Sequence, residues 1–158
     1  MSQSAPNLTN RPLLTIVGPS MPAHTLAYLA TPYSKYEGGN LELAFRDAAR
    51  LAANLMLAGI RVYSPIAHTH PLAVYGNVDP LDHDIWLPFD EAMMQRCDVL
   101  IVAQMNGWKE SKGIDHEIKF FAERRRTIFL LDPVSMIMRR MLAPLTSPAV
   151  AQPIPGEA

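Results

Sequence analysis

The chain alternates short apolar runs with longer segments whose apolar residues recur every three or four positions. Short runs of aliphatic residues, bounded by Gly, Pro or Asp, are typical of buried β-strands. They occupy residues 26–31, 60–64, 99–103 and 127–131. The longer segments, with the spacing of amphipathic helices, occupy residues 40–58, 84–96 and 111–125. This order predicts an α/β fold: a single doubly wound domain, Rossmann-like or flavodoxin-like, with a central parallel sheet flanked by helices.

The ends of one helix and two further segments complete this prediction. Residues 40–58 form the clearest helix, because Asn40 supplies an N-cap and Gly59 a stop signal. Residues 66–80 contain two histidines and several turn formers with little periodicity, which predicts a long loop of the kind that often carries function. The Met-rich residues 135–142 predict a short helix.

Length and composition indicate one globular domain with loose ends. With 158 residues, 49% hydrophobic and 18% charged, the chain is large enough to bury one sizeable core and too short for two. Prolines concentrate near both termini. We therefore predict an N-terminal extension at residues 1–24, the α/β domain at residues 25–142, and a Pro/Ala-rich tail at residues 143–158.

The charge balance narrows the class of partner. Lys and Arg number 14 against 15 Asp and Glu, so no net field attracts a nucleic-acid polymer or a membrane surface, and a small molecule is the expected ligand. The single cysteine, Cys97, excludes an intrachain disulfide and favours a cytoplasmic location. The apolar run at residues 13–17 is too short to cross a membrane, so no membrane association is expected.

The end of the first strand is the first candidate for chemistry. In doubly wound folds, ligands bind beyond the carboxyl ends of the strands. Tyr28 either aims its hydroxyl into that crevice or packs as a core aromatic whose hydroxyl is satisfied locally. Neither a GxGxxG nor a GxxxxGK[ST] motif is present, so the usual dinucleotide and triphosphate cradles are missing and no cofactor is predicted.

Residues 111–117 form the second candidate, because they lie between a predicted strand and a predicted helix. Ser111 and the backbone of Gly113 suit a phosphate, since a helix N-terminus presents free N–H groups and a positive dipole. Glu117 is expected in the first helical turn, where the same dipole favours its ionised form. The alternative is ordinary helix capping by a serine and acids in the first turn.

Asp90 and His68 are less specific candidates. Asp90 lies on the helix predicted at 84–96 and faces either the ligand end of the sheet or solvent. His68 and His70 have the spacing of some metal ligands, but no HExxH motif or cysteine pair accompanies them, so no metal is predicted. We expect His68 to contact a base or to order its loop.

Taken in order, these residues resemble a known superfamily. Tyr28 after the first strand, Asp90 on the helix before residues 99–103, and the run Ser111-x-Gly113-x-x-x-Glu117 form the set. Over residues 26–131 the chain resembles the nucleoside 2-deoxyribosyltransferase-like superfamily, in particular the nucleoside 5′-monophosphate N-glycosidases and uncharacterised bacterial and phage relatives. The resemblance implies cleavage of an N-glycosidic bond, by hydrolysis or by deoxyribosyl transfer.

The resemblance also implies a role for each matching residue. Glu117 corresponds to the nucleophile, Tyr28 to the tyrosine that orients it, and Asp90 to the aspartate that delivers a proton to the leaving base. Ser111 corresponds to a phosphate-binding serine, where enzymes acting on free nucleosides generally carry an acid. Sites in this superfamily are often completed by a neighbouring subunit, which implies a homodimer or a larger homo-oligomer.

The chain departs from the superfamily after the first strand. That loop is often rich in Gly, Ser and Arg, whereas this chain has Thr31-Pro-Tyr-Ser-Lys35, with Thr31, Ser34 and Lys35 as possible phosphate or substrate ligands. Two other functions stay open. One is a nucleotide-sensing module without catalysis. The other is a glycohydrolase acting on NAD, which the absence of a second phosphate cradle disfavours.

Overall fold

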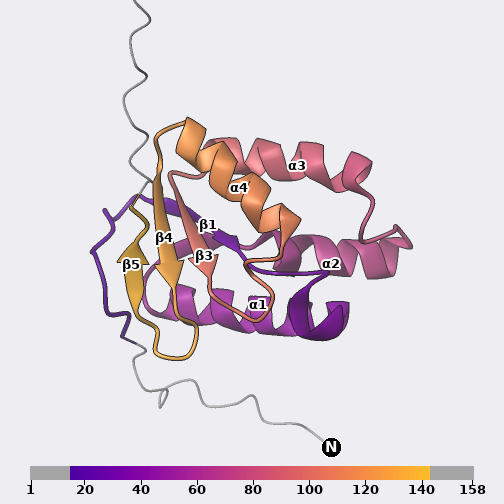
Figure 1. Ribbon diagram of the computed structural model, residues 1–158, viewed down its shortest axis with the longest axis horizontal. Coiled ribbons are helices and arrows are strands. Elements are labelled where there is room, and N and C mark those ends of the chain that lie inside the picture. The colour runs from indigo at the N-terminus through magenta and orange to yellow at the C-terminus, as the bar shows by residue number, and fades with distance from the viewer. Residues whose placement is uncertain (1–14, 143–158) are drawn as a thin grey trace, which may run out of the picture.

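The computed structural model describes residues 15–142, in which five strands form one sheet in the order β2-β1-β3-β4-β5 (Figure 1). The strands are β1 (Leu26–Ala30), β2 (Arg61–Tyr63), β3 (Val99–Ala103), β4 (Thr127–Leu131) and β5 (Met138–Arg140). The first four are parallel, and β5 runs antiparallel to β4. The predicted α/β fold is confirmed. The predicted tail at residues 143–158 lies outside the described residues.

Four α-helices flank the sheet. They are α1 (Leu41–Leu57), α2 (Pro65–Gly76), α3 (His83–Arg96) and α4 (Lys112–Glu123), with a short 3-10 turn, η2 (Tyr36–Gly38), before α1. Helix α1 covers one face, α3 and α4 cover the other, and α2 packs against α1 (Figure 1). Helix α1 begins where predicted, because the Asn40 side chain accepts a hydrogen bond from the backbone N–H of Leu43. No helix within residues 15–142 is both long and apolar enough to cross a membrane.

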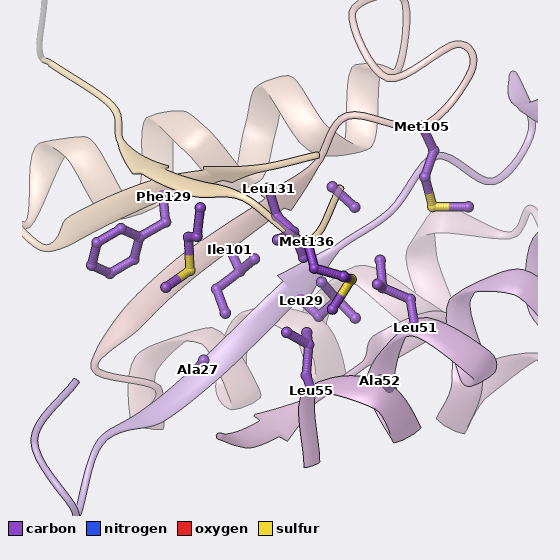
Figure 2. Packing of buried hydrophobic residues seen from close by; sticks show 12 residues of the cluster. Ala27, Leu29, Leu51, Ala52, Leu55, Ile101, Met105, Phe129, Leu131 and Met136 are labelled. Carbon is purple, nitrogen blue, oxygen red and sulfur yellow. The ribbon is translucent and has the colours of Figure 1, made fainter. Parts of the chain in front are cut away.

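Strand β1 shows how the sheet divides its side chains between two cores. Ala27 and Leu29 face α1, where Leu51 and Leu55 pack against them (Figure 2). Tyr28 and Ala30 face the opposite way, toward α3 and α4. This alternation brings the Tyr28 side chain beneath the helix that carries Glu117.

The predicted loop at residues 66–80 is wrong, because most of that segment is helix α2. Ser64 caps the helix by accepting a hydrogen bond from the N–H of Ala67 at 3.4 Å, and Pro65 occupies the first turn, where its missing N–H costs nothing. The buried side chains of α2 are Pro65, His70 and Ala73. A helix that buries these residues has no aliphatic stripe, so its sequence lacks the helical periodicity.

The predicted helix at residues 135–142 is also wrong. Asp132 Oδ1 accepts hydrogen bonds from the N–H groups of Val134 and Ser135, which turns the chain back so that β5 pairs with β4. Within β5 the side chain of Met138 is buried and those of Arg139 and Arg140 are exposed. Within the predicted extension, Val17 forms an isolated parallel bridge with Ile137.

Candidate functional site

A cavity of about 400 Å³ opens at the carboxyl ends of β1 and β3. These two strands are the point where the strand order of the sheet reverses, and doubly wound proteins bind ligands at this switch point. Its wall is formed by the segment after β1, the start of α2, one face of α3 and the first two turns of α4. We call it the switch-point cavity.

Another cavity, of about 430 Å³, lies at the amino ends of β1 and β2, where it is lined by most of residues 15–25, by residues 58–61 and by Met138 of β5. No titratable acid lines it. The two cavities have similar volumes, but acidic side chains line only the switch-point cavity.

Six of the nine residues predicted for the site line the switch-point cavity, and Lys35 is not among them. They are Thr31, Ser34, Asp90, Ser111, Gly113 and Glu117. The cavity-facing residues of α3 follow at intervals of three and four, from His83 through Trp86, Leu87 and Asp90 to Met94. Asp90 therefore faces the ligand end of the sheet rather than bulk solvent.

Glu117 and Asp90 form a pair of carboxyl groups whose titrations are linked. Burial, and to a lesser degree the charge of Asp90, together raise the pKa of Glu117 to about 8. Burial also raises the pKa of Asp90, to about 6. Glu117 is half-buried and lines the cavity. Near neutral pH the pair therefore holds one proton between two carboxyl groups.

The expectation that the helix dipole ionises Glu117 is wrong. Helix α4 begins at Lys112, so the acid in its first turn is Asp115 and Glu117 follows in the second turn. The dipole acts mainly within the first turn. Burial and the neighbouring Asp90 charge act in the opposite direction and raise the pKa of Glu117.

Tyr28 lies directly beneath this acid pair. Its ring is fully buried between Tyr63 and Phe121, with ring centroids 5.6 and 6.1 Å away. Its hydroxyl is near enough to Glu117 to lower the pKa of that carboxyl, while burial raises the pKa of Tyr28 well above its ordinary value. No residue in the described chain gives the hydroxyl complete hydrogen-bond geometry, so its contact with Glu117 is looser than a standard hydrogen bond. Tyr28 is thus a core aromatic whose polar end reaches the site.

The N-terminus of α4 forms one rim of the cavity. Ser111 caps the helix by accepting from the N–H of Ile114 at 3.4 Å, which leaves the serine proton free to donate. The N–H groups of Lys112 and Gly113 have no acceptor within the helix. A β-carbon added to Gly113 would touch only the Ser111 hydroxyl, at 3.8 Å, so the glycine leaves open space beside these donors. The rim is suited to an anion.

Sequence reasoning missed Lys112 and His116, which also line the cavity. The signal for Lys112 was its place inside the Ser-Lys-Gly run, where an ammonium group adds charge to the anion-binding rim. His116 lies one turn before Phe120 on α4, and its Nε2 is 3.2 Å from Glu91 Oε1 without forming a proper hydrogen bond.

Polar atoms without partners gather around this one cavity. Within the part of the chain that the structure describes, the buried side-chain atoms lacking a hydrogen bond are the hydroxyls of Tyr28, Thr31 and Tyr63, Asp90 Oδ1 and His116 Nε2. Thr31, Asp90 and His116 line the cavity itself. Because buried polar atoms are nearly always paired, such a cluster indicates a place where a polar ligand or water completes the structure.

His68 does not line the switch-point cavity. Its ring is stacked on Phe89 with centroids 5.3 Å apart, and the residue is exposed, whereas the next residue, Thr69, does reach the cavity. The cause is the helical conformation of α2, which turns successive side chains in different directions. Among residues 15–142, no three His, Cys, Asp or Glu side chains come together in a way that would hold a metal ion.

Comparison with known proteins identifies a family but no activity. Over 84 residues the chain is 29% and 31% identical to the leucine-tRNA ligases of two strains of Rhizobium etli. These matches cover 53% of this chain and 10% of each ligase, so the chain spans about a tenth of the length of these curated relatives. Residues 25–133 match a family described as a domain of unknown function, DUF1937. The chain therefore belongs to the DUF1937 family, and the matched region contains every residue that lines the switch-point cavity.

Proposed function

We propose that this protein cleaves the N-glycosidic bond of a nucleoside 5′-monophosphate, with Glu117 as the nucleophile. The observation that carries this proposal is that the carboxyl groups of Glu117 and Asp90 lie in the wall of one cavity whose rim suits a phosphate, where burial raises the pKa of both. One ionised and one protonated carboxyl group are what glycosidic cleavage requires. Hydrolysis and transfer to a second base are both compatible with this arrangement.

The proposed reaction has two steps. A bond forms between a Glu117 carboxylate oxygen and the anomeric carbon while the bond to the base breaks, and the departing nitrogen takes a proton from Asp90. Water, or the nitrogen of a second base, then attacks the anomeric carbon and gives its proton to Asp90, which frees Glu117. In the free protein Glu117 has the higher pKa. The shared proton therefore lies on Glu117 before the substrate binds. Positive charge developing on the sugar favours the other placement of this proton, with Glu117 ionised and Asp90 protonated.

Tyr28 and the α4 rim serve this reaction in different ways. The Tyr28 hydroxyl, which has no other partner among the described residues, holds the Glu117 carboxylate in place. Ser111, the Gly113 backbone and the Lys112 ammonium group bind the 5′-phosphate away from the reacting carbon. Binding energy from this remote group then fixes the sugar over Glu117.

The acid pair predicts a bell-shaped dependence of kcat/KM on pH. Below about 6 both carboxyl groups are protonated, so no nucleophile is present, and above about 8 both are ionised, so no proton donor remains. We expect the maximum between these values. Initial rates of base release in buffers from pH 4.5 to 9.5 measure the profile, and a rate that rises steadily through pH 9 would contradict the shared proton.

The phosphate rim predicts a selective effect of two small substitutions. Ser111→Ala and Gly113→Ala should each raise KM for the nucleoside monophosphate by about tenfold, since each removes or blocks a phosphate contact worth about 1.4 kcal/mol. Activity on the corresponding free nucleoside should change less than twofold. The Gly113→Ala protein should be at least as stable as the wild type, because alanine is the better helix former. Equal losses on both substrates would refute the phosphate assignment.

A panel assay tests the proposed function. The protein is incubated with nucleosides, their 5′-monophosphates and NAD, and free base is followed by chromatography. We expect base release from at least one monophosphate and none from NAD. Release of nicotinamide alone would favour an NAD glycohydrolase, and tight binding without base release would favour a sensing module.

A further inference from the structure

A hydrogen-bonded chain of three side chains reaches the switch-point cavity from α1 and α2. The Tyr33 hydroxyl is 2.7 Å from Nδ1 of His70, and Nε2 of His70 is 3.1 Å from Oε2 of Glu42. His70 is buried, with Phe45 stacked on its ring at a centroid distance of 4.5 Å. Tyr33 lies in the cavity wall, between Thr31 and Ser34.

The Glu42 carboxylate fixes which ring nitrogen of His70 carries the proton when the imidazole is neutral. A carboxylate only accepts, so His70 Nε2 carries the proton and donates it to Glu42. In the neutral imidazole Nδ1 is then an acceptor, and it takes the proton of the Tyr33 hydroxyl. Burial raises the pKa of Tyr33 to about 12, so the phenol keeps this proton in the bond.

Tyr33 lines the cavity, and this direction determines what its hydroxyl can offer a ligand bound there. Its only hydrogen is committed to His70, so the phenol oxygen offers lone pairs and no donor. A ligand group there must therefore donate a hydrogen bond. A ligand with only an acceptor at that place would meet an oxygen that it cannot pair with, which is costly in a buried site.

We propose that Tyr33 is a specificity-determining residue that accepts a hydrogen bond from a ring hydroxyl of the substrate sugar, and that Glu42 and His70 hold it as an acceptor. This inference rests on the proposed function, because the sugar is the hydroxyl-bearing part of that substrate. His70 and Glu42 are positioning residues that act through Tyr33 and do not touch the substrate.

The test compares three sugar phosphates that the protein cannot cleave further: ribose 5-phosphate and its 2-deoxy and 3-deoxy forms. Calorimetry on the wild type should show one deoxy sugar binding at least fivefold more weakly than ribose 5-phosphate. Tyr33→Phe should bind ribose 5-phosphate and that deoxy sugar within twofold of each other. Tyr36→Phe is the matched control, because Tyr36 donates to Asp47 at 2.8 Å and lies outside the cavity. Tyr36→Phe should bind that deoxy sugar more weakly than ribose 5-phosphate by the same factor as the wild type.

The possible results distinguish failure of the role of Tyr33 from failure of the proposed function. If Tyr33→Phe discriminates as strongly as the wild type, the role of Tyr33 is refuted while the proposed function stands. If the wild type binds all three alike, the role of Tyr33 is refuted, and if none binds and no monophosphate releases base in the panel assay, both are refuted.

The His70 tautomer gives a second, independent readout. Nitrogen-15 NMR, assigned with His70→Gln, should show the neutral form protonated on Nε2. The Nδ1-protonated form, or an imidazolium with both nitrogens protonated, would overturn the acceptor role of Tyr33.

Discussion

Glu117→Gln is expected to lower base release from a nucleoside monophosphate by at least about a thousandfold, since an amide cannot form the glycosyl intermediate. The amide has nearly the same shape as the carboxyl group, so the cavity and the Tyr28 contact should keep their form. Affinity for the substrate should change much less than turnover. Single-turnover kinetics with saturating protein measures the chemical step apart from binding. Turnover within tenfold of the wild type would end the assignment of Glu117 as the nucleophile.

The same variant has a stability signature that does not depend on catalysis. Folding raises the pKa of Glu117 from 4.5 to about 8, so the folded state binds a proton more tightly than the unfolded state. That contribution to stability is complete at low pH and is lost as pH rises through this window. The glutamine does not titrate. We therefore expect Glu117→Gln to gain stability over the wild type between pH 5 and pH 8, by on the order of 3 kcal/mol.

Urea unfolding at several pH values measures this difference, with Glu123→Gln as the control because Glu123 is exposed at the end of α4. The control should show no such trend. A Glu117→Gln protein that is equally stable relative to the wild type at pH 5 and pH 8 would show that Glu117 is not held in a protonating environment.

Asp90→Asn has the second largest expected effect. A positioned general acid contributes about a hundredfold to ten-thousandfold, so base release from an ordinary purine monophosphate should fall within this range. An N7-methylated purine already carries a positive charge and leaves as a neutral base without protonation. Its release should fall less than tenfold. Asp84→Asn, on the exposed first turn of α3, is the control and should leave both rates unchanged.

The comparison between the two leaving groups separates acid catalysis from other roles of Asp90. If both substrates lose activity equally, Asp90 acts by positioning substrate or by holding the cavity together. If neither loses activity, Asp90 has no part in the reaction.

The strands and long helices could be predicted because local signals are strong there. Asn40 and Gly59 mark the ends of a regular apolar stripe, and the aliphatic run of β3 is bounded by Asp98. The order of these elements also gave the edge of the sheet where ligands bind. Thr31, Ser34, Ser111, Gly113 and Glu117 could therefore be placed at this edge from the sequence, whereas Asp90 could not, because its helix face was left open.

Helix α2 and strand β5 could not be predicted, because tertiary contacts decide them. Helix α2 buries His70 against α1, and this polar contact with Glu42 leaves no apolar pattern in the sequence. Strand β5 exists because a turn at Asp132 brings Met138 back onto β4. Neither event has a local sequence signature.

The protonation state of Glu117 could not be predicted from the sequence either, because contacts between helices decide it. The position of Glu117 along its helix suggested an ionised acid, but its pKa depends on burial and on Asp90, which belongs to another helix. The packing of α3 against α4 sets that proximity. The same holds for Tyr33, whose hydrogen bond is decided by two residues 9 and 37 positions away along the chain.

The most direct test uses a 2′-fluoro-arabinosyl nucleotide, because fluorine slows both steps and lets a covalent intermediate accumulate. After an acid quench and digestion, mass spectrometry locates the sugar phosphate on a peptide. We predict that it is attached to Glu117 in the wild type and is absent in Glu117→Gln. Attachment to Asp90, or release of base without any adduct on Glu117, would contradict the account.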